Sequence, residues 1–367
     1  MRMGFDARGL SARRRTLRTG VENYASYLLS SLADVQPDLT LFQARGAAPV
    51  LPERSVRRVY SGLAQSGVAW GLFGLGLQTF RAKIDVLVIP EQYVPIICNA
   101  RASLVVVHDV AFRRYPTHYR RDLLLKLKVS TALVTRLASH IVADSAITKV
   151  DLVNFYGIEE KRISVVPLGC DHELYHPRER AESAHILDRL GVRGTYLLYV
   201  GSLHPRKNLL HLIRALAYLT EFSLVFAGKD TGFGSVLLAE AARLNVRDRV
   251  VLLGYVDDDI KAHLMAQACA FLFPSYYEGF GLPVLEAMAS GAPVVASKSG
   301  AIPEVVGDTG ALVQPGDLLG LVEAVRATTN PTKREAIVTA SLARARTFTW
   351  SRTARAILEI ANELGTS

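Results

Sequence analysis

Short apolar runs recur along the whole chain, with helix-like segments between them, and this alternation limits the fold more than any other feature. The runs are apolar throughout, which is typical of parallel strands covered by helices on both faces. They are MRMGFDA, LTLFQA, DVLVIP, SLVVVHD, HIVADS and ISVVPLG in the first half, then TYLLYVGS, SLVFAGK, VVLLGYV, AFLFPS, PVVAS and GALVQP. The helix patterns between them include 20–34, 123–137, 209–219 and 284–290. The alternation predicts an α/β chain of two doubly wound, Rossmann-like sheets in series.

A charged segment, HPRERAESAHILDRLGVRG, separates the two series of runs. We therefore expect a first domain over residues 1–169 and a second over 170–346. The chain has 367 residues, half of them hydrophobic, which is enough for two cores. Because open parallel sheets bind ligands at the carboxyl ends of their strands, we expect the functional site in a cleft between the domains.

The stretch EGFGLPVLEAMASGAPV, residues 278–294, places Glu278 and Glu286 on either side of a glycine turn. An apolar strand pattern precedes the turn and a helix pattern follows it. Glycines at such a junction let the backbone approach a ligand, and a helix N-terminus offers N–H groups to an anion. Carboxylates beside a bound anion suit a ligand that also carries hydroxyls, such as a sugar nucleotide.

A second motif, GSLHPRKN, follows a strand pattern that ends at Gly201 and contains the basic pair Arg206 and Lys207. Arginine supplies a planar fork of donors and lysine a point charge, so the pair can hold a diphosphate. The same charges would help a nucleoside diphosphate to leave. The alternative is a solvated basic pair at the start of a helix.

Two features of the first domain are weaker signals. His108 directly follows the strand SLVVV, where an imidazole can contact a ligand or shuttle a proton, although a lone histidine is more often structural. Gly20 opens a helix pattern and can bring backbone N–H groups close to a phosphate, or it can be a plain turn. After the strand HIVA, Ser145 or Asp144 is expected to cap the next helix.

No pattern predicts a metal site. The run Asp257-Asp258-Asp259 suits the dipole at a helix start, and we interpret it as capping rather than metal binding. The backbone before it, up to Val256, is a candidate wall for a nucleotide base. The three cysteines, Cys98, Cys170 and Cys269, are far apart, which favours free thiols.

Charge is unevenly distributed along the chain. Residues 1–170 hold 23 Lys and Arg against 13 Asp and Glu, whereas residues 171–367 hold 20 against 21. A basic first half can face an anionic membrane or a phosphorylated acceptor, or it can be ordinary solvated surface. No nucleic-acid module is visible, so we expect no nucleic-acid partner. Neither a signal peptide nor a membrane-spanning stretch stands out.

Together the motifs resemble the retaining family-4 glycosyltransferases, which have the GT-B fold. The resemblance covers nearly the whole chain and is carried by GSLHPRKN, PSYYEGFGLPVLEAMASGAPVV, GAIPEVVGDTGALVQPGD, PLGCDHELYHP and FDAR…TGVENY. The TFTW segment and the last helix are similar to the group 1 subset labelled mannosyltransferases. The resemblance implies two Rossmann-like domains facing across a cleft, the first binding the acceptor and the second binding the nucleotide sugar. It also implies that the C-terminal helix, residues 347–367, crosses back to the first domain.

The resemblance further implies roles for single residues. Glu286 would bind the donor ribose, and Glu278 would contact the transferred sugar. Arg206 and Lys207 would hold the diphosphate near Gly201. The other implied contacts are backbone N–H groups around Phe280, Gly281 and Leu282, Gly20 from the first domain, and His108 beside the sugar. The loop 10–19 departs from the family because it is rich in arginine rather than glycine.

We therefore expect a retaining hexosyltransferase that needs neither metal nor cofactor, since the nucleotide diphosphate sugar is a substrate. The resemblance favours GDP-mannose as donor and a hydroxyl of a glycan, glycolipid or lipid-linked acceptor, in cell-surface polysaccharide or glycoconjugate synthesis. The alternatives are a UDP- or dTDP-hexose donor, or a catalytically silent sugar-nucleotide-binding protein. The expected location is the cytoplasm, with peripheral contact to the inner membrane face through the basic N-terminal half.

Overall fold

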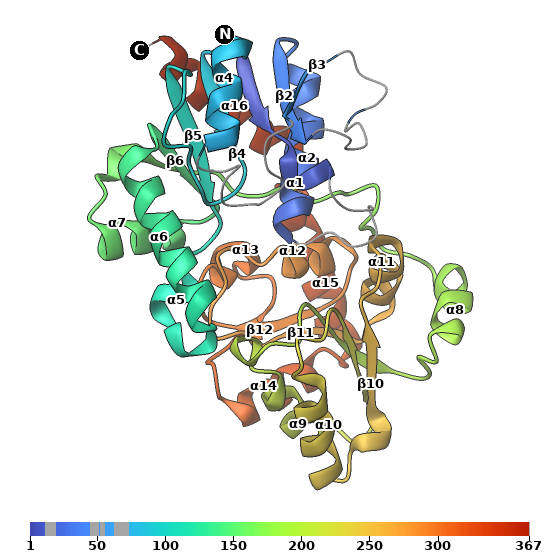
Figure 1. The fold of residues 1–367 in the computed structure, drawn as a ribbon. Coiled ribbons are helices and arrows are strands. Elements are labelled where there is room, and N and C mark those ends of the chain that lie inside the picture. Colours follow the sequence, from blue (N-terminus) through green and yellow to red (C-terminus); the bar gives the residue numbers. More distant parts are fainter. Residues whose placement is uncertain (12–19, 45–50, 52–55, 62–72, 367) are drawn as a thin grey trace. The chain divides into compact units, whose positions relative to one another are not determined.

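The computed structural model describes residues 1–11, 20–44, 51, 56–61 and 73–366. The chain divides into two compact units, one formed by Met1–Gly169 with Thr349–Ser367 and the other by Cys170–Phe348. Each unit has a parallel sheet with helices around it (Figure 1). The predicted α/β class with two parallel sheets is confirmed.

The first unit is built on a seven-stranded sheet in the order β3-β2-β1-β4-β5-β6-β7, and every neighbouring pair is parallel. The strands are β1 Met3–Asp6, β2 Leu39–Ala44, β3 Arg57–Ser61, β4 Val86–Ile89, β5 Ala102–Val107, β6 His140–Ala143 and β7 Ile163–Val165. The order reverses between β1 and β4. In doubly wound sheets, ligands bind outside the carboxyl ends of the strands at this reversal.

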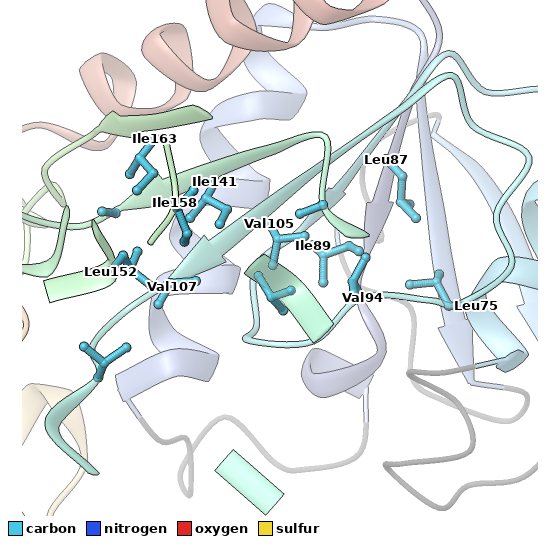
Figure 2. Packing of buried hydrophobic residues seen from close by; sticks show 14 of the residues in the cluster. Leu75, Leu87, Ile89, Val94, Val105, Val107, Ile141, Leu152, Ile158 and Ile163 are labelled. Atoms are coloured by element: carbon cyan, nitrogen blue, oxygen red, sulfur yellow. The ribbon is translucent and has the colours of Figure 1, made fainter. Parts of the chain in front are cut away.

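Helices of the first unit connect and cover these strands (Figure 1). They are α1 Arg8–Ser11, α2 Gly20–Val35, α4 Leu75–Ala82, α5 Ala111–Arg114, α6 Arg121–Leu137, α7 Ala146–Tyr156 and α16 Trp350–Thr366, with short 3₁₀ turns at Pro116–His118 and Glu160–Arg162. Figure 2 shows the apolar side chains of β4, β5 and β6 packed in one buried cluster, which also takes in Leu152 of α7. Because these strands are apolar on both faces, both faces of the sheet must be covered by other parts of the chain.

Helix α16 packs onto α2 within the first unit, although it comes last in the sequence. The Trp350 ring stacks on Tyr27 at 5.2 Å and meets the Tyr24 ring edge-on at 5.7 Å. The Thr353 hydroxyl donates a hydrogen bond of 2.8 Å to the Pro167 carbonyl. These contacts hold the start of α16 to α2 and to the segment that follows β7.

The second unit has a six-stranded parallel sheet in the order β10-β9-β8-β11-β12-β13, which reverses between β8 and β11. Its strands are β8 Tyr196–Val200, β9 Ser223–Ala227, β10 Val250–Gly254, β11 Ala270–Phe273, β12 Val294–Ser297 and β13 Ala311–Val313. Its helices are α8 Arg180–Arg189, α9 Leu209–Leu216, α10 Gly234–Arg243, α11 Asp258–Gln267, α12 Leu282–Ala289, α13 Ile302–Val306, α14 Leu318–Ala327 and α15 Pro331–Ala345, with 3₁₀ turns at Pro205–Lys207 and Arg247–Arg249.

The sequence analysis did not predict strand β3. Strand β3 carries the sequence RRVYS and lies at the edge of its sheet, where polar side chains reach water, so it lacks the apolar signature of the other strands. The apolar stretch 62–80 contains glycines and polar residues, so it suits a buried amphipathic helix better than a membrane span. Residues 62–72 lie outside the described residues, and α4 begins only at Leu75.

Candidate active site

The glycine turn before α12 has the strand–turn–helix form expected from the sequence. Gly281 is the N-cap of α12 and has a φ of +103°, a conformation that other residues rarely adopt. A Cβ at this position would lie 2.5 Å from the Ile302 side chain. The backbone of Glu278 is held from the other side, because Ala301 donates to its carbonyl at 2.9 Å. The turn is therefore a rigid support for the Glu278 side chain.

Glu278 is buried and lies against the predicted basic pair. The Lys207 Nζ lies 2.5 Å from Oε1 of Glu278, and the Arg206 Nη1 lies 3.5 Å from Oε2. Burial opposes ionisation of the carboxyl, but the charges of Lys207 and Arg206 outweigh it and hold the pKa of Glu278 below its usual range. Two cations thus share one carboxylate, and the cluster keeps an excess positive charge.

The loop after β8 positions both cations. Residues Pro205–Lys207 form one 3₁₀ turn, which begins with the His204 side chain accepting a hydrogen bond from the Arg206 N–H at 3.2 Å. The Arg206 guanidinium also donates to the Tyr277 carbonyl, in the loop that carries Glu278. The cluster of Arg206, Lys207 and Glu278 follows the carboxyl ends of β8 and β11, where the order of the second sheet reverses. This is the position at which such sheets bind ligands.

Glu286 lies on α12 and is paired with a residue that the sequence analysis did not select. The Lys261 Nζ lies 3.0 Å from each carboxylate oxygen of Glu286 and 2.9 Å from Oδ1 of Asp258. Its ammonium also lies 5.0 Å from the centre of the Tyr175 ring. Burial raises the pKa of Glu286 despite the lysine. Burial also opposes the charge on Lys261, but its two carboxylate partners outweigh this and raise its pKa.

The carboxylate of Glu286 keeps acceptor capacity. Its Oε2 receives no hydrogen bond from the described residues, although Lys261 lies within ion-pair distance. An ionised carboxylate can accept several hydrogen bonds, so the lone pairs of Glu286 exceed what Lys261 alone uses. The only sequence signal for Lys261 was the Asp258-x-x-Lys261 spacing on α11, which by itself reads as an ordinary surface pair.

His108 lies in the first unit, directly after β5. Its Nδ1 lies 2.7 Å from Oδ2 of Asp144, and its Nε2 lies 3.0 Å from the Pro90 carbonyl oxygen. Burial lowers the tendency of the ring to protonate, but Asp144 and the Pro90 carbonyl outweigh it and raise the pKa of His108. Since both nitrogens face acceptors, the arrangement suits the protonated ring.

The capping expectations have separate outcomes. Ser145 caps α7 by accepting a hydrogen bond from Thr148 N–H, as expected, whereas Asp144 is the partner of His108. Asp257 caps α11 by accepting from Ile260 N–H at 2.9 Å, also as expected. Across the ranges that the structure describes, no group of three or more His, Cys, Asp or Glu side chains could hold a metal ion.

The other selected residues occupy varied positions. Gly20 is the exposed first residue of α2, and no atom of the described residues lies within 4 Å of a Cβ placed there. The Phe280 ring is buried edge-on against Phe348 at 6.1 Å. The remaining positions are Gly201 at the end of β8, half-buried Val256 before α11, and Leu282 at the first turn of α12. Residues 12–19 of the arginine-rich loop lie outside the described residues.

Known proteins match both units. The family model described as Glycosyltransferase Family 4 matches residues 18–174, and the one described as Glycosyl transferases group 1 matches residues 194–330. The O-antigen chain mannosyltransferase B of Escherichia coli is 30% identical over 269 residues, which cover 71% of this chain and 70% of that protein. The chain belongs to the group 1, family-4 glycosyltransferases.

Other similar proteins support the same family and the GT-B fold of this glycosyltransferase. The MMP alpha-(1->4)-mannosyltransferase of Mycolicibacterium hassiacum is 35% identical over 193 residues, covering 50% of this chain and 44% of that protein. Sucrose-phosphate synthase from Thermosynechococcus elongatus superposes with a TM-score of 0.76 at 20% identity, covering 99% of this chain and 98% of the other. HepE of Anabaena in complex with UDP and glucose gives a TM-score of 0.73 at 22% identity and 99% of both chains.

The glycosyltransferase has no helix, within its described ranges, that combines the length and apolar character needed to cross a membrane.

Proposed function

We propose that this glycosyltransferase is a retaining hexosyltransferase that moves mannose from GDP-mannose to a hydroxyl of a glycan, glycolipid or lipid-linked acceptor, without a metal ion. The observation that carries the proposal is the convergence of Arg206 and Lys207 on Glu278 at the reversal of the second sheet. Mannose is favoured because two of the relatives are mannosyltransferases by name.

The excess positive charge of the cluster suits a diphosphate. In the proposed complex, Arg206 and Lys207 turn part of their hydrogen bonding from Glu278 to the phosphate oxygens and stabilise the charge that develops on departure. Glu278 is then available to the sugar hydroxyls, and Glu286 accepts from the ribose hydroxyls. Neither glutamate has to act as an acid or a base.

The transfer itself needs positioning more than proton relays. The bond from the sugar C1 to the phosphate oxygen breaks, and the acceptor oxygen bonds to C1 on the same face. The acceptor proton passes to the departing phosphate oxygen, so the configuration at C1 is retained. His108 contacts the transferred sugar and is not the base, because both of its nitrogens already face acceptors.

A second candidate donor is a UDP- or dTDP-hexose. Solved structures of HepE contain UDP and UDP-glucose. A catalytically silent nucleotide-sugar-binding protein would keep the same donor contacts. We also propose a cytoplasmic location with peripheral membrane contact and synthesis of a cell-surface polysaccharide or glycoconjugate as the setting.

The test has two stages. Thermal unfolding with GDP, UDP and dTDP and their hexose conjugates identifies the donor, since a ligand that binds only the folded state raises the melting temperature. Transfer from that donor is then followed by NMR of the product anomer in the presence of EDTA. We expect GDP-mannose to stabilise most and the product to keep the donor's configuration. Inversion, or loss of turnover in EDTA, would contradict the mechanism, and binding without turnover across an acceptor panel would favour the silent protein.

A further inference from the structure

Tyr24 is a buried residue of α2 whose ring packs against the imidazole of His108. The two ring centres lie 4.8 Å apart in an edge-on arrangement, and Tyr24 is 1% exposed. Its hydroxyl is also buried and has no hydrogen-bond partner among the residues that the structure describes. A buried hydroxyl without a partner is unfavourable, because it has lost its hydrogen bonds to water. This hydroxyl therefore points to an acceptor that completes it.

The carboxylate of Asp144 has the complementary need. Its Oδ2 lies 2.7 Å from Nδ1 of His108, whereas its Oδ1 is buried and receives no hydrogen bond from any described residue. Asp144 is 2% exposed, so bulk water does not hydrate it. Hydrogen-bond donors stabilise the ionised form of a buried carboxylate. Tyr24 thus offers a donor that lacks an acceptor, and Asp144 offers an acceptor that lacks a donor. Both side chains contact His108.

The hydroxyl of Tyr24 keeps its proton. Burial raises the pKa of Tyr24, and the negative charge of Asp144 raises it further. The effect of Asp144 also shows that its carboxylate is near enough to act on the hydroxyl. Tyr24 is therefore a permanent hydrogen-bond donor next to the His108–Asp144 pair.

The last helix holds the Tyr24 ring. Trp350, the first residue of α16, meets the Tyr24 ring edge-on at 5.7 Å and stacks on Tyr27 at 5.2 Å. Aromatic pairs of this kind add stability beyond the apolar area that they bury. The indole Nε1 of Trp350 is also buried and has no partner in the described part of the chain. It is the alternative donor for Asp144.

We infer that Tyr24 is a positioning residue for the transfer reaction, because its hydroxyl donates a hydrogen bond to Oδ1 of Asp144, directly or through one buried water. The inference rests on the proposed function, in which His108 contacts the transferred sugar. With both oxygens engaged, the carboxylate of Asp144 cannot rotate, and His108 keeps one orientation. The His108 side chain is still 19% exposed, so a ligand can reach the ring that Asp144 holds. A group fixed before binding contacts its ligand at little entropic cost.

Tyr24→Phe removes the hydroxyl and keeps the ring. The matched control is Tyr27→Phe, the same change one turn away on α2, because Tyr27 contacts the same Trp350 ring. The first measurement is the downfield proton NMR resonance of His108 Nδ1–H, assigned by its loss in His108→Gln. We expect Tyr24→Phe to shift or broaden this resonance and to lower the melting temperature. Tyr27→Phe should leave the resonance in place.

Two results of this measurement would overturn the inference. If the Tyr24 hydroxyl has no partner, Tyr24→Phe should leave the resonance unchanged and keep or raise the melting temperature. If Trp350→Phe perturbs the resonance and Tyr24→Phe does not, the indole is the donor to Asp144.

The second measurement is steady-state transfer. Tyr24→Phe should lower kcat about three- to tenfold, the effect of one hydrogen bond that orients a contact to the transferred sugar. Its GDP affinity should equal that of wild type, since Arg206, Lys207 and Glu278 belong to the second unit. Tyr27→Phe should keep the wild-type kcat. An equal loss of kcat in both variants would contradict the inference, because it would reflect the packing of α2 in general.

The NMR and melting experiments need neither donor nor acceptor, which separates this inference from the proposed function. If no nucleotide binds but the His108 resonance depends on the Tyr24 hydroxyl, the proposed function fails and the contact of Tyr24 with Asp144 stands. If transfer from GDP-mannose is found but Tyr24→Phe matches Tyr27→Phe in both resonance and kcat, Tyr24 is not a positioning residue and the proposed function stands.

Discussion

The Lys261 ammonium lies 3.0 Å from both carboxylate oxygens of Glu286, and both side chains are buried. A buried pair of this kind is costly to break, because the charge left behind has lost its hydration without gaining a partner. Lys261 therefore has an electrostatic role at this site. It keeps Glu286 available as a charged acceptor at the position proposed for the donor ribose.

The first prediction removes this lysine. Lys261→Met should destabilise the protein by about 3–5 kcal/mol, the usual result of breaking a buried ion pair. The donor KM should rise more than kcat falls, because Glu286 would be held in the wrong place or protonated. Urea unfolding and steady-state kinetics measure the two effects. Lys333→Met on α15 is the control, since Lys333 is exposed.

A double variant separates folding from binding. Lys261→Met combined with Glu286→Gln leaves no buried charge at the pair, so it should recover much of the lost stability. It should not recover donor affinity, because an amide is a weaker acceptor for ribose hydroxyls than a carboxylate. Recovery of both would mean that Glu286 has only a structural role.

The second prediction concerns the cluster around Glu278. Lys207→Ala, Arg206→Ala and Glu278→Ala should each reduce turnover by about 10²–10³, as expected when one group that stabilises developing charge is removed. Each variant should keep its fold, checked by circular dichroism. Arg214→Ala on α9 is the matched control, because Arg214 pairs with Glu240 on the surface. Near-wild-type turnover in all three cluster variants would contradict the assignment of this cluster as the donor site.

Much of this arrangement could be predicted from the sequence, for a topological reason. Continuous apolar runs identified the parallel strands, and parallel strands bring their carboxyl ends to one edge. That is why Arg206 and Lys207 after β8 meet Glu278 after β11, which lies 71 positions beyond Lys207. The edge strand β3 was missed because an edge needs no apolar signature.

Partners of buried charges were harder to predict. Lys261 follows three aspartates on a helix with weak amphipathic periodicity, and nothing in the local sequence indicates that it is buried against Glu286. Asp144 was interpreted as a possible helix cap, but the neighbouring Ser145 takes that role. The pairing of Asp144 with His108 follows from the adjacency of β5 and β6, which only the strand order reveals.

The third prediction uses the pH dependence of the His108–Asp144 pair. The folded-state pKa of His108 is raised above its ordinary value of 6.5. The stabilising effect of the charged ring is therefore fully present below about pH 6 and is lost as the pH rises through the folded pKa. Wild type should exceed His108→Gln in melting temperature by more at about pH 6 than at about pH 9.

The control for this experiment is His185→Gln, which removes an exposed histidine of α8. The melting temperature of His185→Gln should differ little from that of wild type, both at about pH 6 and at about pH 9. A His108→Gln difference that stays constant with pH would show that the ring contributes by packing, for example against Tyr24 at 4.8 Å, and not by charge.

The fourth prediction tests Gly20 as a phosphate contact. Among the described residues, no atom lies within 4 Å of an alanine Cβ built at this position, and alanine is a better helix residue than glycine, so Gly20→Ala should keep or slightly raise the melting temperature. If the backbone of Gly20 approaches the donor diphosphate, the added methyl group should raise the donor KM several-fold at nearly unchanged stability. Titration of GDP and of the full donor, each against wild type, measures this directly. An unchanged donor affinity would make Gly20 an ordinary first residue of α2 and leave the diphosphate to Arg206 and Lys207.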